Sequence, residues 1–206
     1  MRVEVVGELL VVGLEEEYRC LSSAVLGGGL GFVRTWANLQ VPPGYGRTDP
    51  ETHLREATAG LPGPVVGMMT AAPVGRYREA LVGSARVVAT IGLGHPIAAA
   101  GEVVPAAARP GTINLFVVTS VRLTDAGLAG AVQTVTEAKV QALVAAGVRA
   151  RNGPGPATGT ASDALAVACP QFHQGTAEPF AGPASPAGAD LAQAVYRAVL
   201  EGCGDA

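Results

Sequence analysis

The sequence has few aromatic, sulfur-containing or basic residues. Only 4% of the 206 residues are aromatic, and only three are cysteine. Because the cysteines are odd in number and widely spaced, we expect free thiols in a reducing compartment and no disulfide framework. Of the 14 basic residues 13 are arginine, and the formal net charge is −3. There is no basic cluster, so nucleic acid is not an expected partner.

Long hydrophobic runs and metal-binding patterns are also missing. No apolar stretch approaches the roughly 18 residues of a membrane span, and Glu4 and Glu8 interrupt any apolar signal-peptide region. The three histidines are isolated, with no His-Glu-x-x-His or Cys-x-x-Cys pattern, so no zinc site is recognisable. Neither glycine-rich segment, 27–29 or 92–95, completes a nucleotide-binding motif. We therefore expect a cytoplasmic globular protein without a membrane partner, a metal or a cofactor.

Small residues dominate the composition, with 28 glycines and 49% hydrophobic residues. The length is sufficient for one substantial core, which predicts a single domain over residues 1–206. Strands outnumber helices without a regular βαβ alternation, so we predict an α+β fold, a mixed sheet covered by helices. The runs at 65–69, 87–91 and 113–118 are expected to be central strands. Residues 3–14 are expected to form two short strands or a hairpin, with Gly7 at the turn. The other expected elements are strands 21–26, 32–41 and 164–168, and helices 48–59, 124–147 and 185–201.

The single lysine, Lys139, lies on the apolar face of a predicted helix. At roughly 100° per residue it falls within a stripe that contains Val135 and Leu143. A buried lysine reaches out to solvent, pairs with a carboxylate or lines a site. Glu137 lies about 200° round the helix, so the two do not pair within it. Burial disfavours the charged form of an amine, which suits proton transfer or activation of a hydroxyl nucleophile, and we interpret Lys139 as a functional residue.

The segment 158–163 places three hydroxyls and a carboxylate ahead of a predicted strand. Gly159 allows backbone amides to approach a ligand, which favours a hydrogen-bonding cradle, although an ordinary turn explains the composition equally well. Asn38 and Asn114 lie in or beside apolar strands, and each must be a structural clamp or a ligand contact. Thr70 ends an apolar run and is either a satisfied hydroxyl at a strand end or a group that faces a cleft.

Short segments in a fixed order carry the most specific signal. They are 21–29 (LSSAVLGGG), 38–42 (NLQVP), 66–72 (VGMMTAA), 111–114 (GTIN), 136–139 (TEAK) and 157–164 (ATGTASDA). Together they resemble the adenosylcobinamide amidohydrolase family, from about residue 21 to about residue 196. The chain departs from the expected pattern at His95, where an asparagine is expected, and at Ser162, where a threonine is common.

The resemblance implies hydrolysis of the amide that joins the aminopropanol arm to a corrin side chain. The products would be adenosylcobyric acid and aminopropanol, in corrinoid salvage, with the corrinoid substrate as the expected partner. We expect the reaction to be independent of metal. We assign catalytic roles to Lys139, Glu137, Thr160 and Asp163. The residues expected to contact substrate are Ser22, Ser23, Asn38, Thr70, Asn114, Thr136, Thr158 and Ser162.

Two other functions stay open at this point. One is an amide hydrolase with a different substrate, which uses an N-terminal or internal threonine nucleophile. The other is a non-catalytic module that binds a corrinoid or regulates its pathway. The lone lysine on an apolar face argues against the second, because an amide-rich ligand gives no clear need for a desolvated amine. The identity of the nucleophile and the presence of a homo-oligomer are also left open.

Overall fold

The computed structural model describes residues 1–103, 111–171 and 176–204; one histidine, His173, lies outside these ranges. One mixed sheet has the strand order β4-β3-β2-β10-β8-β6-β5, with β1 paired to β2. The strands of this sheet are β1 (Arg2–Val6), β2 (Leu9–Ser22), β3 (Gly29–Gln40), β4 (Val65–Thr70), β5 (Arg78–Val82), β6 (Ala85–Gly92), β8 (Thr112–Thr119) and β10 (Ala164–Cys169). The short strands β7 (Pro96–Ile97) and β9 (Gly159–Thr160) pair with each other, and the helices are α1 (Pro50–Ala57), α2 (Asp125–Ala145) and α3 (Pro186–Cys203), with a 3-10 turn at Val74–Arg76.

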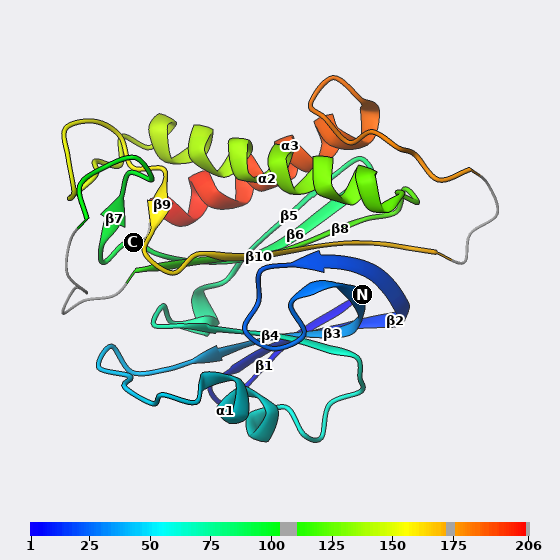
Figure 1. The fold of residues 1–206 in the computed structure, drawn as a ribbon, viewed down its shortest axis with the longest axis horizontal. Coiled ribbons are helices and arrows are strands. Elements are labelled where there is room, and N and C mark those ends of the chain that lie inside the picture. The colour runs from blue at the N-terminus through cyan, green and yellow to red at the C-terminus, as the bar shows by residue number, and fades with distance from the viewer. Residues whose placement is uncertain (104–110, 172–175, 205–206) are drawn as a thin grey trace.

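Strand β2 bends the sheet into two layers. It pairs with β3 along most of its length, with β1 through residues 9–13 and with β10 through its last residues. The register with β3 shifts between Gly13 and Tyr18, an irregularity of the kind that bends and twists a strand. In Figure 1, β1, β3, β4 and α1 form the lower layer, and β5, β6, β8 and β10 form the upper layer.

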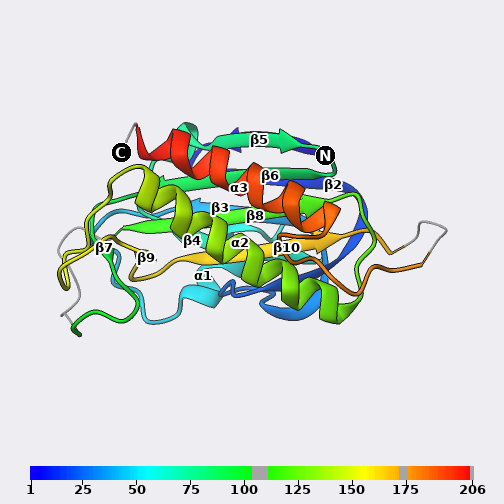
Figure 2. The same cartoon turned by 90° about the horizontal axis from the view of Figure 1, so that it is seen from above.

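Strand β8 is buried on both of its faces. Residues Ile113, Leu115 and Val117 belong to the core beneath the helices, and Figure 2 shows α2 and α3 lying across the upper strands. The alternate residues face the lower layer, where Phe116 stacks on Trp36 of β3 with ring centroids 5.5 Å apart. A strand with helices on one face and a second layer on the other is largely apolar, as β8 is apart from Asn114 and its terminal threonines.

Local signals place the two long helices. Thr124 caps the start of α2 by accepting a hydrogen bond from Gly127 N, and Gly147 follows its end with a φ of 70°. Ser185 caps α3 in the same way, by accepting from Gly188 N. Both predicted helices are therefore confirmed. Within the described ranges, no helix is both long enough and apolar enough to cross a membrane.

The predicted α+β fold, a mixed sheet covered by helices, is confirmed, but three details of the prediction were wrong. Val65–Thr70 forms β4 at the edge of the sheet and is not central; it is apolar because Leu54 of α1 covers its outer side. The expected strand at 21–26 does not form, since β2 extends to Ser22 and Leu26 makes only an isolated bridge with Gly67. Strand β5 and the short strands β7 and β9 were not predicted at all.

Candidate active site

Lys139 and Asp163 form an ion pair at one end of the sheet. Lys139 is only 8% exposed, and its Nζ lies 2.5 Å from Asp163 Oδ2. Helix α2 provides the lysine, and Asp163 immediately precedes β10. The predicted burial of Lys139 on an apolar helix face is confirmed. Its partner is a carboxylate 24 residues away along the chain.

Backbone and side-chain donors hold the Asp163 carboxylate in place. Its Oδ1 accepts hydrogen bonds from Ile113 N at 3.0 Å and from Thr160 N at 3.1 Å. Thr160 Oγ1 lies 2.6 Å from Asp163 Oδ1 and also 2.6 Å from Gly111 O. Since a hydroxyl has one hydrogen, Thr160 can donate to only one of these oxygens at a time. The result is a hydroxyl, a carboxylate and an amine in a connected row.

Gly159 allows the backbone of β9 to pass close to this ion pair. A Cβ at this position would overlap Asp163 Oδ2 and lie 2.9 Å from Lys139 Nζ. Strand β9 is held in place by antiparallel pairing with β7. The requirement for glycine here therefore comes from close approach of the backbone to the ion pair, whereas the sequence predicts close approach to a ligand.

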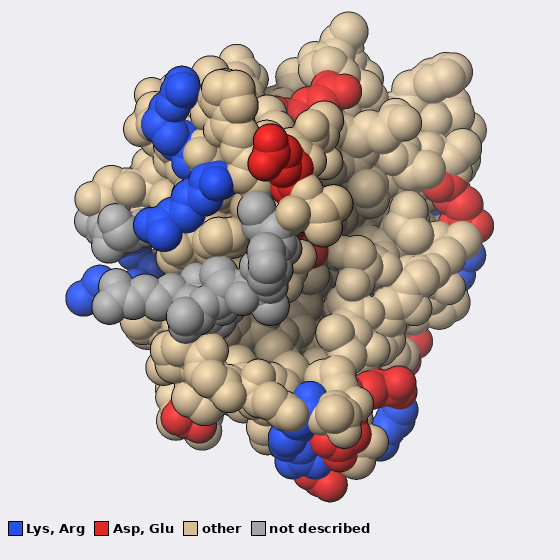
Figure 3. Space-filling view, turned by 60° about the vertical axis from the view of Figure 1, so that its left-hand side comes forward, with Lys and Arg blue, Asp and Glu red and all other residues tan. Residues whose placement is uncertain are grey.

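A hollow of about 460 Å³ lies beside the ion pair, and we call it the lysine hollow. Its lining combines polar and small apolar residues: Ile97, Ala99, Thr136, Lys139, Val140, Thr158, Gly159, Thr160, Ala161 and Asp163. Figure 3 brings this end of the molecule forward and shows that the face is hollowed near its middle. The volume lies within the range of ligand pockets, roughly 300–1,000 Å³.

A second hollow, of about 230 Å³, lies on the other side of the segment 158–163, and we call it the interlayer hollow. Its lining is mainly apolar: Val25, Val41, Pro42, Pro43, Tyr45, Met68, Met69, Thr70, Ala71, Thr112, Ser162 and Ala164. Ser162 Oγ and Thr112 Oγ1 are 2.9 Å apart and share one hydrogen bond. Thus Ser162 lines one hollow while the next residue, Asp163, lines the other.

The two asparagines form a hydrogen-bonded network between the layers. Asn38 Nδ2 donates to Thr90 Oγ1 at 2.8 Å, and Asn114 Nδ2 donates to Asn38 Oδ1 at 2.9 Å and to Met69 O at 2.8 Å. Both asparagine side chains are completely buried. This geometry matches the structural clamp, one of the two roles expected for these asparagines from the sequence. Thr70, likewise buried, accepts a hydrogen bond from Ala72 N and lines the interlayer hollow.

The structure does not bring all of the predicted site residues together. Glu137 is exposed on α2 and does not line the lysine hollow. Ser22 donates to Leu165 O, and Ser23 accepts from Leu165 N, so both attach the end of β2 to β10. Thr136 and Thr158 do line the lysine hollow.

Thr112 and Tyr45 line the interlayer hollow but are not among the site residues predicted from the sequence. Thr112 lies in the quoted segment 111–114, so a signal for it was available. Tyr45 follows a Pro-Pro-Gly turn, and nothing in its surroundings indicated that it lines a hollow.

The cysteines are not suited to nucleophilic chemistry. All three are free, as predicted. Burial raises the pKa of the Cys20 thiol to about 12, and burial also raises the pKa of Cys169. A thiol with a raised pKa carries little thiolate at neutral pH. Across the described parts of the chain, no three His, Cys, Asp or Glu side chains lie close enough to hold a metal ion.

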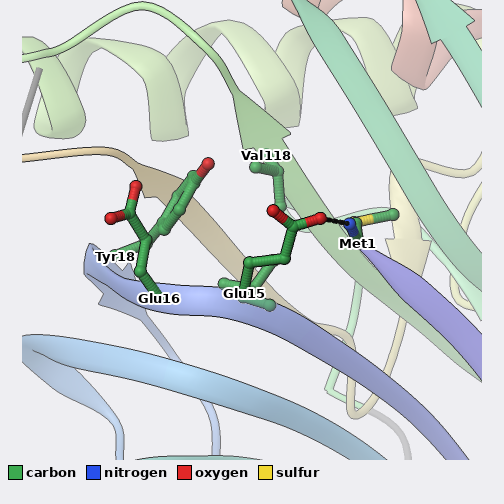
Figure 4. A pocket seen from close by; sticks show the side chains of 6 residues that line it. Met1, Glu15, Glu16, Tyr18 and Val118 are labelled. Atoms are coloured by element: carbon green, nitrogen blue, oxygen red, sulfur yellow. Dashed lines mark ion pairs between the residues drawn. The ribbon is translucent and has the colours of Figure 1, made fainter.

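A third hollow, of about 400 Å³, lies towards the other end of β8, where Val118 contributes to its lining. Figure 4 shows the Glu15 carboxylate directed at the Met1 amine, 3.5 Å away, and Glu16 beside Tyr18. Burial raises the pKa of Tyr18, and the charges of Glu16 and Glu15 raise it further. This acidic hollow contains none of the residues predicted from the sequence, and we do not include it in the candidate site.

Fold and site together define an α+β protein with a threonine–aspartate–lysine group at one end of a mixed sheet. The family model for adenosylcobinamide amidohydrolase (CbiZ) matches residues 1–206, and the chain belongs to this family.

Two curated proteins are similar to parts of this chain. An adenosylcobinamide amidohydrolase of Halobacterium salinarum is 39% identical over 129 residues, which is 59% of this chain and 51% of that protein. An uncharacterized protein of Methanocaldococcus jannaschii is 35% identical over 102 residues, which is 49% of this chain and 38% of that protein. The chain thus spans about half, or less, of the length of these relatives.

Proposed function

We propose that the protein hydrolyses the amide between the aminopropanol arm and a corrin side chain of adenosylcobinamide, in corrinoid salvage. Membership of the adenosylcobinamide amidohydrolase family supports the reaction class and a corrinoid substrate. The observation that carries the proposal is the ion pair of Lys139 and Asp163, because it lines a hollow that hydroxyl groups also line. A charged pair at the wall of a hollow is the arrangement expected of a catalytic site.

The lysine hollow suits a neutral amide arm. A corrin macrocycle is too broad for about 460 Å³, so only a side arm would enter while the ring stays outside. Thr136 Oγ1 donates to Val132 O, and Thr158 Oγ1 accepts from Ala99 N, so each hydroxyl keeps further capacity for hydrogen bonds. Small apolar residues complete the walls, as in most ligand sites.

The reaction consumes one water molecule. The water oxygen becomes part of the new carboxylate, the C–N bond breaks, and the amine leaves with a hydrogen from water. Negative charge develops on the amide oxygen, and the leaving nitrogen needs a proton. We assign one or both of these tasks to Lys139, with Asp163 as the residue that positions it and Thr160 as the residue that positions Asp163.

We further infer that catalysis does not require a metal. In a metal-dependent amidohydrolase the ion stabilises the oxyanion as a Lewis acid. A lysine held at the wall of a partly apolar hollow can supply the same positive charge, and a low local dielectric strengthens its effect. The ion pair with Asp163 keeps the amine in one position, so little reorganisation is needed during the reaction.

The test is an assay of the purified protein with adenosylcobinamide and no added metal. We expect release of free aminopropanol and a corrinoid with one new carboxylate, with the Lys139→Met variant as the inactive control. Tight corrinoid binding without turnover would identify a binding module instead. Loss of activity in a chelator, with recovery on addition of zinc, would overturn the metal-independent part of the proposal.

A further inference from the structure

The interlayer hollow is the open end of the space between the two layers. Residues two apart on a strand share a face, so Thr112 and Asn114 of β8 point to the same side. Thr112 lines the hollow, and Ala164, which pairs with Asn114 in the β8–β10 register, lines it too. Asn114 therefore lies directly behind the lining, one step deeper than Thr112.

Asn114 has an acceptor without a partner at this depth. Its Oδ1 is buried and makes no hydrogen bond to any residue that the structure describes. The orientation of the amide is determined by its neighbours, because Nδ2 donates to Asn38 Oδ1 and to Met69 O. Turning the amide over would place an oxygen against the carbonyl of Met69. A buried acceptor without a donor costs free energy, so a ligand that brings an N–H group here is favoured.

The walls suit a flat ring. Met68, Met69 and two prolines provide apolar surface, and Tyr45 contributes an aromatic ring. His53 of α1 holds this tyrosine, with the rings stacked at 5.6 Å and Tyr45 Oη 3.0 Å from His53 Nδ1. Aromatic and methionine side chains pack well against planar heterocycles.

Three side-chain hydroxyl groups contribute to the lining, those of Thr70, Thr112 and Ser162. Thr70 uses its oxygen as an acceptor for Ala72 N, so its hydrogen is available for a further bond. Ser162 and Thr112 are hydrogen-bonded to each other and can each accept another donor. A ligand with two neighbouring hydroxyls, such as a ribose, would find partners for both.

We propose that the interlayer hollow binds a purine nucleoside, namely the adenosyl group that adenosylcobinamide carries. An adenine base offers flat apolar faces, and its amino group would donate to Asn114 Oδ1 once a small movement of the lining exposes this oxygen. The ribose matches the hydroxyls. The volume of about 230 Å³ suits one part of a larger ligand. This inference rests on the proposed function. It places the adenosyl group on one side of the segment 158–163 and the scissile amide on the other, with Ser162 and Asp163 facing them respectively.

The first test compares two substrates that differ in their upper axial ligand, adenosylcobinamide and cyanocobinamide. Ala71 lines the interlayer hollow, and Ala71→Phe narrows it. We expect this variant to lower the ratio of kcat/KM for the adenosyl substrate to that for the cyano substrate by at least about tenfold. Ala59→Phe is the matched control, because Ala59 is an exposed alanine that lines no described hollow, and it should leave the ratio unchanged. An equal loss on both substrates in Ala71→Phe would overturn the subsite.

The second test separates the subsite from the proposed function by measuring adenosine binding calorimetrically, without any corrinoid. We expect the wild type and Ala59→Phe to bind adenosine, and Ala71→Phe to bind it at least about tenfold more weakly. Adenosine binding in a protein that cleaves neither corrinoid would support the subsite and refute the proposed function. Corrinoid cleavage without a preference for the adenosyl group, together with no adenosine binding, would refute the subsite alone.

Discussion

Strand β8 has two equally buried faces that differ in chemistry. The face beneath the helices is apolar through Ile113, Leu115 and Val117, and beyond its end lies the charged pair of Lys139 and Asp163. The face between the layers combines aromatic packing with amides and hydroxyls that carry no charge. Both faces become polar at the same end of the sheet. In the proposed function, charge lies where a bond is broken and neutral hydrogen-bonding groups lie where the ligand is held.

The physical costs of the two arrangements differ accordingly. Burying an ion pair requires the desolvation of two charges, which the mutual attraction offsets only when the geometry is good. Asp163 meets this condition through Ile113 N and Thr160 N as well as Lys139. A neutral amide network costs less but still needs every donor and acceptor matched. The unmatched oxygen of Asn114 is therefore the feature of the interlayer face that indicates a ligand.

The largest expected effect is on the charged side. Lys139→Met should reduce kcat by about 100- to 10,000-fold, the usual loss for a positioned acid or base. Lys139→Arg should be just as inactive if the lysine transfers a proton, because arginine does not lose its proton, and partly active if only charge is needed. The measurement is kcat at saturating substrate, with the melting transition of each variant as the control for folding. Near-normal turnover by folded Lys139→Met would show that this lysine is not catalytic.

The next largest effect should be on the free energy of unfolding, in variants of two neighbouring residues of β8. Leu115→Ala leaves a cavity beneath the helices and should cost about 2–5 kcal/mol. Asn114→Ala removes neutral hydrogen bonds between the layers and should cost about 1–3 kcal/mol. Denaturant unfolding of both variants gives the two free energies of unfolding. A larger cost for Asn114→Ala would mean that the amide network, and not the helix-side core, chiefly supports this end of the sheet.

Thr160 should have a moderate effect on activity. Thr160→Val removes the hydroxyl beside Asp163 at nearly constant size and should lower kcat about 10- to 100-fold, since hydrogen bonds to charged groups contribute about 1.5–3 kcal/mol. Thr160→Ser keeps the hydroxyl and should retain most of the activity. The melting temperature should change less than turnover in both variants. Equal losses of stability and turnover in Thr160→Val would indicate an ordinary structural turn at 158–163.

The smallest expected effect concerns a carboxylate outside both hollows. Ser84 N and Ser84 Oγ donate to Asp190 Oδ2, and these bonds, the backbone one first, hold the pKa of Asp190 below its usual value of 3.8. Because the pKa is lower in the folded state, this stabilisation is fully present above 3.8 and is lost as the pH falls through the folded pKa.

Asp190→Asn should therefore melt about 1–3 °C lower than the wild type at pH 7 and show a smaller difference near pH 3. Its kcat should be unchanged, since Asp190 lines neither hollow. Thermal melts at the two pH values provide the measurement. A difference that grows towards acid pH would have the wrong sign for a lowered pKa.

Several parts of the site followed from local sequence. Lys139 stood out because its helix has a clear apolar stripe and capping residues at both ends. Residues 158–163 stood out because glycine and hydroxyl groups precede the apolar run at 164–168. Other assignments did not follow from local sequence. Ser22 and Ser23 have the same side chain as Ser162, but they bond to strand β10, and no local signal distinguishes such serines from serines that line a hollow.

By itself the sequence determined the helices, most strands, the buried lysine and the family resemblance, because caps, turns and periodicity depend on residues a few positions apart. Only the tertiary structure decided which of these groups meet. The bend in β2 brings Asn38 to Asn114, 76 residues later, and the parallel pairing of β8 with β10 brings Ile113 to Asp163, 50 residues later. These contacts depend on strand order and register, which are set by the packing of whole layers and not by any local pattern.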